Sequence, residues 1–194
     1  GTALQASLDT RMPFFNGIKK ENTMEKYTKT KECIWAILCV IVLTAFDQFT
    51  KLLALRQLKG NEPFVLWKGV FELHYLENRG AAFGILQNQQ IFFVCITIIM
   101  VIVIGAGFCR TPKDKKFLPM KITLVFLLSG AIGNFIDRMI RGFVVDFFYF
   151  SLIDFPIFNV ADIYVTVSFV VLAVLILFVY KEEDLAVYTP KKKK

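Results

Sequence analysis

The sequence predicts an all-α membrane protein with four transmembrane helices. Of its 194 residues, 56% are hydrophobic, and its mean hydropathy is +0.55, an apolar content that soluble domains of this length rarely reach. The charges are segregated, because the long apolar runs carry almost none and the short connectors carry most. The net charge of +7 therefore indicates a membrane protein rather than a nucleic-acid-binding protein, whose Lys and Arg would follow one exposed face.

Residues 1–31 form a polar extension that lacks the apolar core of a signal peptide. The chain begins with Gly1, so part of this extension is expected to be a cloning remnant, and Met12 and Met24 are candidate native starts. Residues 32–182 form the predicted membrane domain, and residues 183–194 form a basic tail.

Four segments have the length of a membrane-spanning helix, which needs about 20 largely apolar residues. Ile91–Cys109 carries no charge, and Ile163–Tyr180 is nearly as apolar. Cys33–Leu55 and Lys121–Ile140 qualify as well, although each carries polar residues near one end. The four cysteines contain no CxxC pair, so we expect buried free thiols rather than a disulfide or metal site.

Lys and Arg in the short connectors set the orientation of these helices. The N-terminal extension, the connector after the second helix and the C-terminal tail are all rich in Lys, which predicts that both termini are cytoplasmic. Connectors 56–90 and 139–158 then lie outside. Residues 70–75 alternate loosely in polarity and follow turn signals, which predicts a short β-hairpin or small sheet on the membrane surface. Its expected aromatic anchors at the headgroup level are Phe64, Trp67 and Tyr75.

Polar residues from separate segments are predicted to meet at one depth near the outer face. An ionisable group inside a membrane costs about 3 kcal/mol on insertion scales, so it usually faces the bundle and has a function. Gly130 and Gly133 leave room for a close helix contact beside this site. The residues concerned are Asp47, Lys51, Asn134, Asp137, Arg138, Asp146, Asn159 and Asp162.

Simpler interpretations remain open for some of these residues. Asp47 and Lys51 are also consistent with an ion pair at a helix end, and Asp137 with the interfacial end of a helix. Asp146 lies between Val and Phe residues, so it is either buried with a partner or catalytic. His74 is the single histidine of the chain, which favours a position on a strand surface over a metal site.

The chemistry available at this face is limited to carboxylates, amides and one Arg. The sequence has no credible Ser/His pair, no HExxH, no P-loop and no dinucleotide fingerprint, and we expect neither a metal nor a cofactor. Two aspartates brought close together share one proton. The ionised member can activate water while the other hydrogen-bonds a scissile carbonyl, which is peptide hydrolysis. A small carboxylate-based membrane transporter is the alternative, although its site would lie near the bilayer midplane.

Five sequence blocks resemble the signatures of the lipoprotein signal peptidases (signal peptidase II), and they occur in that family's order over about residues 34–181. The blocks are Asp47–Lys51, Asn78–Gly84, Gly133–Arg138, Val144–Phe147 and Phe158–Asp162. Two departures concern helix packing rather than the reactive residues. Ile163 and Ser168 replace a small polar residue and a Gly of the family pattern, and the extended N-terminus is also atypical.

The resemblance implies a fold and a site. It implies four helices with a small β-cradle and an outer surface helix, and an aspartyl endopeptidase of the bacterial inner membrane whose active site lies near the outer face. Asp146 and Asp162 would form the catalytic dyad. The substrate would be a prolipoprotein cut just before its diacylglyceryl-modified Cys, and globomycin-type cyclic peptides would block the reaction. The implied supporting residues are Asn134, Arg138, Asn159, Asp47, Asn78, Lys51 and Asp137.

Overall fold

The computed structural model describes residues 2–80 and 89–189, with side chains from residue 30 onward. The chain divides into two compact units, residues 1–38 and 39–194. The first unit is helical from Thr2 onward and holds the first part of helix α1 (Thr2–Gln57). The second unit begins within α1 and holds the rest of the fold.

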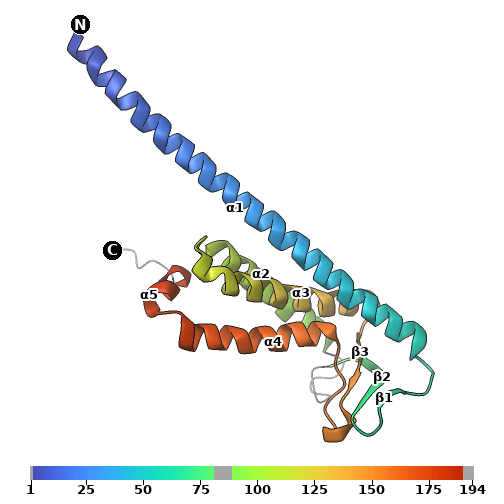
Figure 1. Cartoon of the computed structure of the whole chain (residues 1–194). Helices are drawn as coiled ribbons and strands as arrows, with labels where there is room; N and C mark the ends of the chain where they lie inside the picture. Colours follow the sequence, from blue (N-terminus) through green and yellow to red (C-terminus); the bar gives the residue numbers. More distant parts are fainter. Residues whose placement is uncertain (1, 81–88, 190–194) are drawn as a thin grey trace. The chain divides into compact units, whose positions relative to one another are not determined.

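Four helices of the described chain are long and apolar enough to cross a membrane, as the sequence predicts. They are the Thr30–Gln57 part of α1, α2 (Gln90–Arg110), α3 (Leu118–Arg141) and α4 (Val160–Val174). A 3-10 turn, Lys115–Phe117, precedes α3, and a π-helical turn, Leu175–Val179, extends α4. In the apolar stretch of α3, 44% of the residues are buried, against 11% in each of the other three, so α3 is the central helix (Figure 1).

A three-stranded antiparallel sheet lies at one end of helices α3 and α4 (Figure 1). The predicted hairpin is present as β1 (Phe64–Trp67) and β2 (Phe71–Asn78), and β2 is the middle strand. The third strand, β3 (Val144–Tyr149), comes from the connector that the sequence analysis left without regular structure. Its first four residues are all buried, so it lacks the alternation by which a surface strand is found.

Two apolar clusters hold the second unit together. One lies between the helices and is built on residues such as Leu124, Leu127 and Tyr180. The other lies under the sheet and joins α1, β3 and α4 through Ala54, Leu58, Val145, Phe147 and Val160. This second cluster fixes β3, and with it Asp146, against the ends of two membrane helices.

Close packing between α3 and its neighbours depends on two glycines, as predicted. A Cβ atom on Gly130 would lie 2.5 Å from the carbonyl oxygen of Ala161, and one on Gly133 would lie 2.5 Å from Oδ2 of Asp47. No side chain fits at such distances. The glycines therefore allow α1 and α4 to bring their polar residues to α3.

The cysteines are free, but the prediction that they are buried is wrong. Cys95 and Cys109 are exposed on α2, and Cys33 and Cys39 are half-buried on α1. Apolar side chains on a membrane helix can face lipid, so an apolar sequence context does not imply burial within the protein. Beside the sheet, Ser151–Ile153 forms a 3-10 turn, and the surface helix implied by the resemblance stays a prediction. The Ala81–Gly84 part of the second sequence block lies outside the described residues.

Candidate active site

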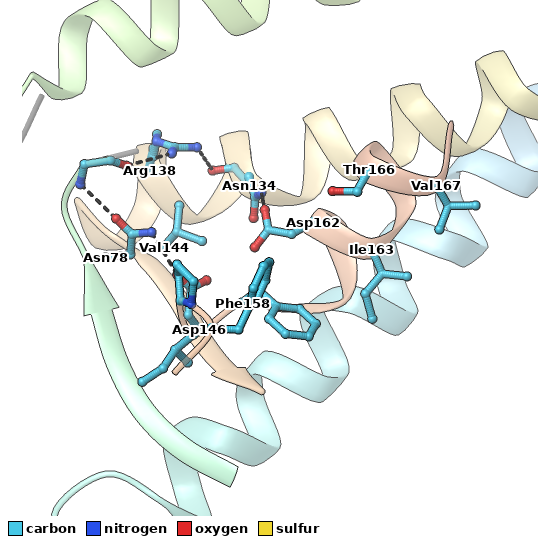
Figure 2. Close-up of a pocket in the computed structure, with 14 residues that line it drawn as sticks. Asn78, Asn134, Arg138, Val144, Asp146, Phe158, Asp162, Ile163, Thr166 and Val167 are labelled. Atoms are coloured by element: carbon cyan, nitrogen blue, oxygen red, sulfur yellow. Dashed lines mark hydrogen bonds between the residues drawn. The ribbon is translucent and has the colours of Figure 1, made fainter. Parts of the chain in front are cut away.

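A cavity of about 420 Å³ opens where β2, β3, α3 and α4 meet (Figure 2). Polar and apolar residues line the cavity together. The polar residues are Asn78, Asn134, Arg138, Asp146, Asp162 and Thr166. The apolar wall includes Phe155, Pro156, Ile157, Phe158, Ile163 and Val167. Five of the residues singled out from the sequence therefore line one cavity.

Asp146 projects from β3 into the cavity and is 1% exposed. Each of its carboxyl oxygens accepts a hydrogen bond from an asparagine: Oδ1 from Nδ2 of Asn159 at 2.6 Å, and Oδ2 from Nδ2 of Asn78 at 2.8 Å. Burial, together with the neighbouring Asp162 carboxylate, raises the pKa of Asp146 from 3.8 to about 7. Asp146 is thus buried with partners, which was one of the two interpretations left open by its sequence context.

Asp162 is fixed by the start of helix α4. Asn159 is the N-cap residue of this helix and has an extended backbone. The two residues form a capping box: the Asp162 N–H donates to Oδ1 of Asn159 at 3.0 Å, and the Asn159 N–H donates to Oδ2 of Asp162 at 3.1 Å. The other oxygen, Oδ1, accepts a hydrogen bond from Nδ2 of Asn134 at 2.8 Å. Both oxygens of Asp162 therefore have N–H donors.

Asn159 connects the two aspartates. It is fully buried, and its side-chain amide bonds Asp162 through Oδ1 and Asp146 through Nδ2. Both carboxyls line the same cavity and accept hydrogen bonds from the same residue, Asp146 from Nδ2 of Asn159 and Asp162 from its backbone N–H. A pair of this kind shares a proton, because two adjacent buried carboxylates cannot both ionise at neutral pH.

Arg138 lies one helical turn after Asn134 and places a cation at the rim of the cavity. Its guanidinium donates to the carbonyl oxygens of Asn134 and Gly80, both at 3.4 Å, and lies 4.8 Å from the ring centre of Phe93. The Arg138 carbonyl accepts a hydrogen bond from Gln90. The sequence analysis missed Gln90 and Phe93, which lie at the start of a helix that it treated as purely apolar.

A second polar group lies behind the cavity and does not line it. Lys51 contacts Asp47 at 2.9 Å and Asp137 at 3.2 Å, and all three side chains are 0% exposed. Asp47 accepts a hydrogen bond from the Ala161 N–H at 2.9 Å, and Asp137 accepts one from the Val145 N–H at 3.1 Å. This buried ion cluster therefore ties α1 to α3, α4 and β3.

The position of the cluster excludes the two simpler interpretations. Asp47 and Lys51 are not an isolated pair at a helix end, and Asp137 does not mark an interface with solvent, because each is buried and has partners on other elements. The sequence analysis missed two members, Gln48 and Arg141, which both contact the Asp137 carboxylate. Their helical spacing could have identified them, because Gln48 lies one helical turn before Lys51 and Arg141 lies one helical turn after Asp137.

His74 lies on β2 outside the cavity, as its sequence context favoured. Its Nε2 lies 2.8 Å from Oε2 of Glu72, and its ring packs against Tyr149 with 4.7 Å between the centres. Among the described residues, no group of three or more His, Cys, Asp or Glu side chains is arranged to hold a metal ion.

Comparisons with known proteins agree on one family. Residues 39–178 match the family model described as signal peptidase (SPase) II. The chain is 45% identical over 146 residues to the lipoprotein signal peptidase of Streptococcus thermophilus (strain CNRZ 1066), which covers 75% of this chain and 92% of that protein. It is 46% identical over 135 residues to the lipoprotein signal peptidase of Brevibacillus brevis (strain 47), covering 70% and 89%. A solved bacterial membrane enzyme, determined by the in meso method at 2.3 Å, is similar with a TM-score of 0.66 at 34% identity, covering 82% and 94%.

Proposed function

Because the chain belongs to the signal peptidase II family, and is therefore a membrane protease that processes prolipoproteins, we propose that Asp146 and Asp162 are its catalytic dyad. The observation that carries this proposal is the pair of buried carboxyls in one cavity, each of which accepts a hydrogen bond from Asn159: Asp146 from Nδ2 and Asp162 from the backbone N–H. The transporter alternative is set aside, since the relatives are peptidases.

The dyad performs hydrolysis with one shared proton. The ionised carboxylate takes a proton from a water molecule as the water oxygen attacks the scissile carbonyl carbon. The protonated carboxyl donates its proton to the carbonyl oxygen, which gives a tetrahedral diol. When the diol collapses and the C–N bond breaks, one diol hydroxyl gives its proton to the ionised carboxylate and the leaving amine takes the proton of the other carboxyl, so the dyad again holds a single proton. Asn134, Asn159 and Asn78 keep the two carboxyls in place during these steps.

The apolar wall of the cavity supports a lipid-modified substrate. Phe155, Ile163 and Val167 line the cavity and are 45%, 40% and 55% exposed, so the wall continues onto the outer surface of α4. That surface faces lipid in a membrane-spanning helix. Acyl chains on a cysteine could therefore remain in the bilayer while the peptide bond before that cysteine reaches the dyad. We propose cleavage at this bond in diacylglyceryl-modified prolipoproteins.

The distribution of charge supports an active site near the outer face of the bacterial inner membrane. The Lys-rich connector between α2 and α3 lies at the opposite end of the helices from the sheet and the cavity (Figure 1). It is joined there to the C-terminal segment by an ion pair between Lys116 and Asp184 and by a 2.8 Å hydrogen bond between Thr111 and Tyr188. Because positively charged connectors tend to stay in the cytoplasm, this arrangement supports our proposal that both termini are cytoplasmic.

Cleavage of a purified diacylglyceryl-modified precursor in detergent tests the proposed function. Wild-type protein should release the signal peptide, whereas Asp146→Asn and Asp162→Asn should not. Asp154→Asn is a matched control, because Asp154 is an exposed aspartate next to β3 that bonds Tyr149 and does not line the cavity. Normal cleavage by either dyad variant would disprove the dyad, and equal cleavage of an unlipidated precursor would disprove the substrate class.

Globomycin-type cyclic peptides are expected to occupy the same cavity. They should raise KM for the precursor and leave kcat unchanged, because they compete for the space beside the dyad. Inhibition that excess precursor does not relieve would contradict binding at this position.

A further inference from the structure

We propose that Lys51 is a positioning residue of the active site. It holds the Asn134 side chain in the orientation in which Nδ2 of that amide donates to Asp162. Lys51 does not line the cavity, so it acts on the reaction through the Asn134 amide and through its positive charge, which favours the ionised form of Asp146. This inference rests on the proposed catalytic role of Asp162.

The Asn134 amide faces hydrogen-bond donors at its oxygen and a hydrogen-bond acceptor at its nitrogen. Its Oδ1 accepts hydrogen bonds from Nζ of Lys51 at 2.8 Å and from Nδ2 of Asn159 at 3.2 Å. Its Nδ2 donates to Oδ1 of Asp162 at 2.8 Å. A half-turn of the amide would place Nδ2 against two donors and would place Oδ1 against a carboxylate. All three interactions would then be lost.

Lys51 can serve only as a donor in this arrangement. An ammonium group has three N–H donors and no acceptor. The three acceptors around Nζ are Oδ2 of Asp47 at 2.9 Å, Oδ2 of Asp137 at 3.2 Å and Oδ1 of Asn134. The group is completely buried and its donors are all used, so it cannot move or admit water. The ion cluster therefore fixes the ammonium, and the ammonium fixes the amide.

The effect extends to the second aspartate. Asn159 donates from Nδ2 to Asn134 and also to Oδ1 of Asp146 at 2.6 Å, while its own Oδ1 accepts from the Asp162 N–H. If the Asn134 oxygen turned away, Asn159 would lose one of its two acceptors. Lys51 thus lies at the start of a hydrogen-bond chain that supplies N–H donors to both carboxyls of the proposed dyad.

The competing explanation is that Lys51 only neutralises the carboxylates of Asp47 and Asp137. The two explanations can be separated by removing one ion pair at a time while the net charge of the cluster stays the same. If Lys51 positions Asn134, the effect depends on which pair is removed; if Lys51 only neutralises charge, it does not. Asp47→Asn with Lys51→Met removes one pair and the Lys51–Asn134 bond together, while Arg141 still contacts Asp137. Asp137→Asn with Arg141→Met removes the other pair and keeps the Lys51–Asn134 bond. The second double variant is the matched control for packing and charge.

Both double variants are purified, their unfolding midpoints are measured, and kcat and KM are determined across pH with a diacylglyceryl-modified precursor. We expect Asp47→Asn/Lys51→Met to lower kcat about 10-fold to 100-fold, the range for losing a hydrogen bond to a charged group. The acid limb of the kcat profile should move to higher pH by about one unit, because an amide oxygen facing the dyad and the loss of the Lys51 charge near Asp146 both disfavour the ionised form. KM should change little. The control should unfold at a similar midpoint. Its kcat should also fall, because Asp137 accepts the Val145 N–H beside Asp146, but the acid limb of its profile should stay at the wild-type pH.

The same pH shift in both double variants, or a wild-type profile in Asp47→Asn/Lys51→Met, would overturn the proposal. Asn134→Leu adds a second test, since it removes the amide itself. Adding Asp47→Asn/Lys51→Met to Asn134→Leu should lower kcat no further, and multiplicative losses would show that Lys51 does not act through Asn134. Asp146→Asn and Asp162→Asn separate this outcome from the proposed function: activity in those variants would disprove the dyad, whatever Lys51 does.

Discussion

Asp146→Asn should make the protein more stable at alkaline pH even though it should abolish activity. The pKa of Asp146 is raised from 3.8 to about 7, so the folded protein retains a proton that the unfolded chain releases. The stabilisation from this proton is complete below about pH 4 and is lost as pH rises through about 7. The loss amounts to about 4 kcal/mol, because one pH unit corresponds to about 1.4 kcal/mol.

An asparagine at this position carries no charge at any pH and so avoids this loss. It replaces one carboxyl oxygen by an NH2 group, which cannot accept the hydrogen bond from Asn78 or Asn159, at a cost of about 2 kcal/mol. The net gain at pH 8.5 is then about 2 kcal/mol, or about 6 °C in the unfolding midpoint for a chain of this size. At pH 4 the variant should be less stable than wild type, because the gain is absent and the cost remains.

Thermal unfolding in one detergent, followed for both proteins at several pH values, measures this difference. The sign of the difference in midpoint should reverse between pH 4 and pH 8.5. Asp154→Asn should show no such reversal, since Asp154 is exposed. A difference between Asp146→Asn and wild type that is the same at every pH would refute the inference that Asp146 is a buried carboxyl with a raised pKa.

Three further changes test other parts of the structure. Gly130→Val should destabilise the protein by about 3 kcal/mol and lower its unfolding midpoint, because its side chain would collide with the Ala161 carbonyl; a midpoint like that of wild type would contradict the close α3–α4 contact. Asn159→Ala should reduce kcat at least 10-fold, since it removes a donor to Asp146. It should also destabilise the protein by about 1 kcal/mol, since it removes the N-cap of α4. An unchanged kcat would exclude the bridging role of Asn159. Lys116→Met should change stability by less than about 1 kcal/mol, because its ion pair is partly exposed, and a larger loss would indicate that the connector is more tightly held.

The buried ion cluster explains how helices α1, α3 and α4 and strand β3 bring polar groups to one place within an apolar fold. Two carboxylates, Asp47 and Asp137, are neutralised by Lys51 and Arg141, and both also accept backbone N–H groups from other elements. Removing one partner of such a pair is costly because it leaves an uncompensated buried charge. The cluster therefore specifies which helix ends meet. It also fixes the relative positions of the elements that carry the cavity residues.

Local sequence patterns were enough to find the four membrane-spanning helices and the polar residues that gather at one cavity. Hydropathy over about 20 residues is a local property, so the helices Gln90–Arg110 and Val160–Val174 could be found without any knowledge of their neighbours. An aspartate between Val and Phe residues, Asp146, could likewise be recognised as buried, because an isolated charge is rarely tolerated in such a run.

The hydrogen bonds that connect these residues could be identified only from the folded structure. Asn78 bonds Asp146 across 68 positions of the chain, and Asp47 bonds the Ala161 N–H across 114. The strand Val144–Tyr149 exists because β2 and the end of α1 cover it, and the same kind of distant contact fixes the orientation of the Asn134 amide. Hydropathy and residue type are local properties, so they can be evaluated from the sequence. Strand pairing and the direction of a hydrogen bond depend on partners that are remote in sequence, so they require the tertiary structure.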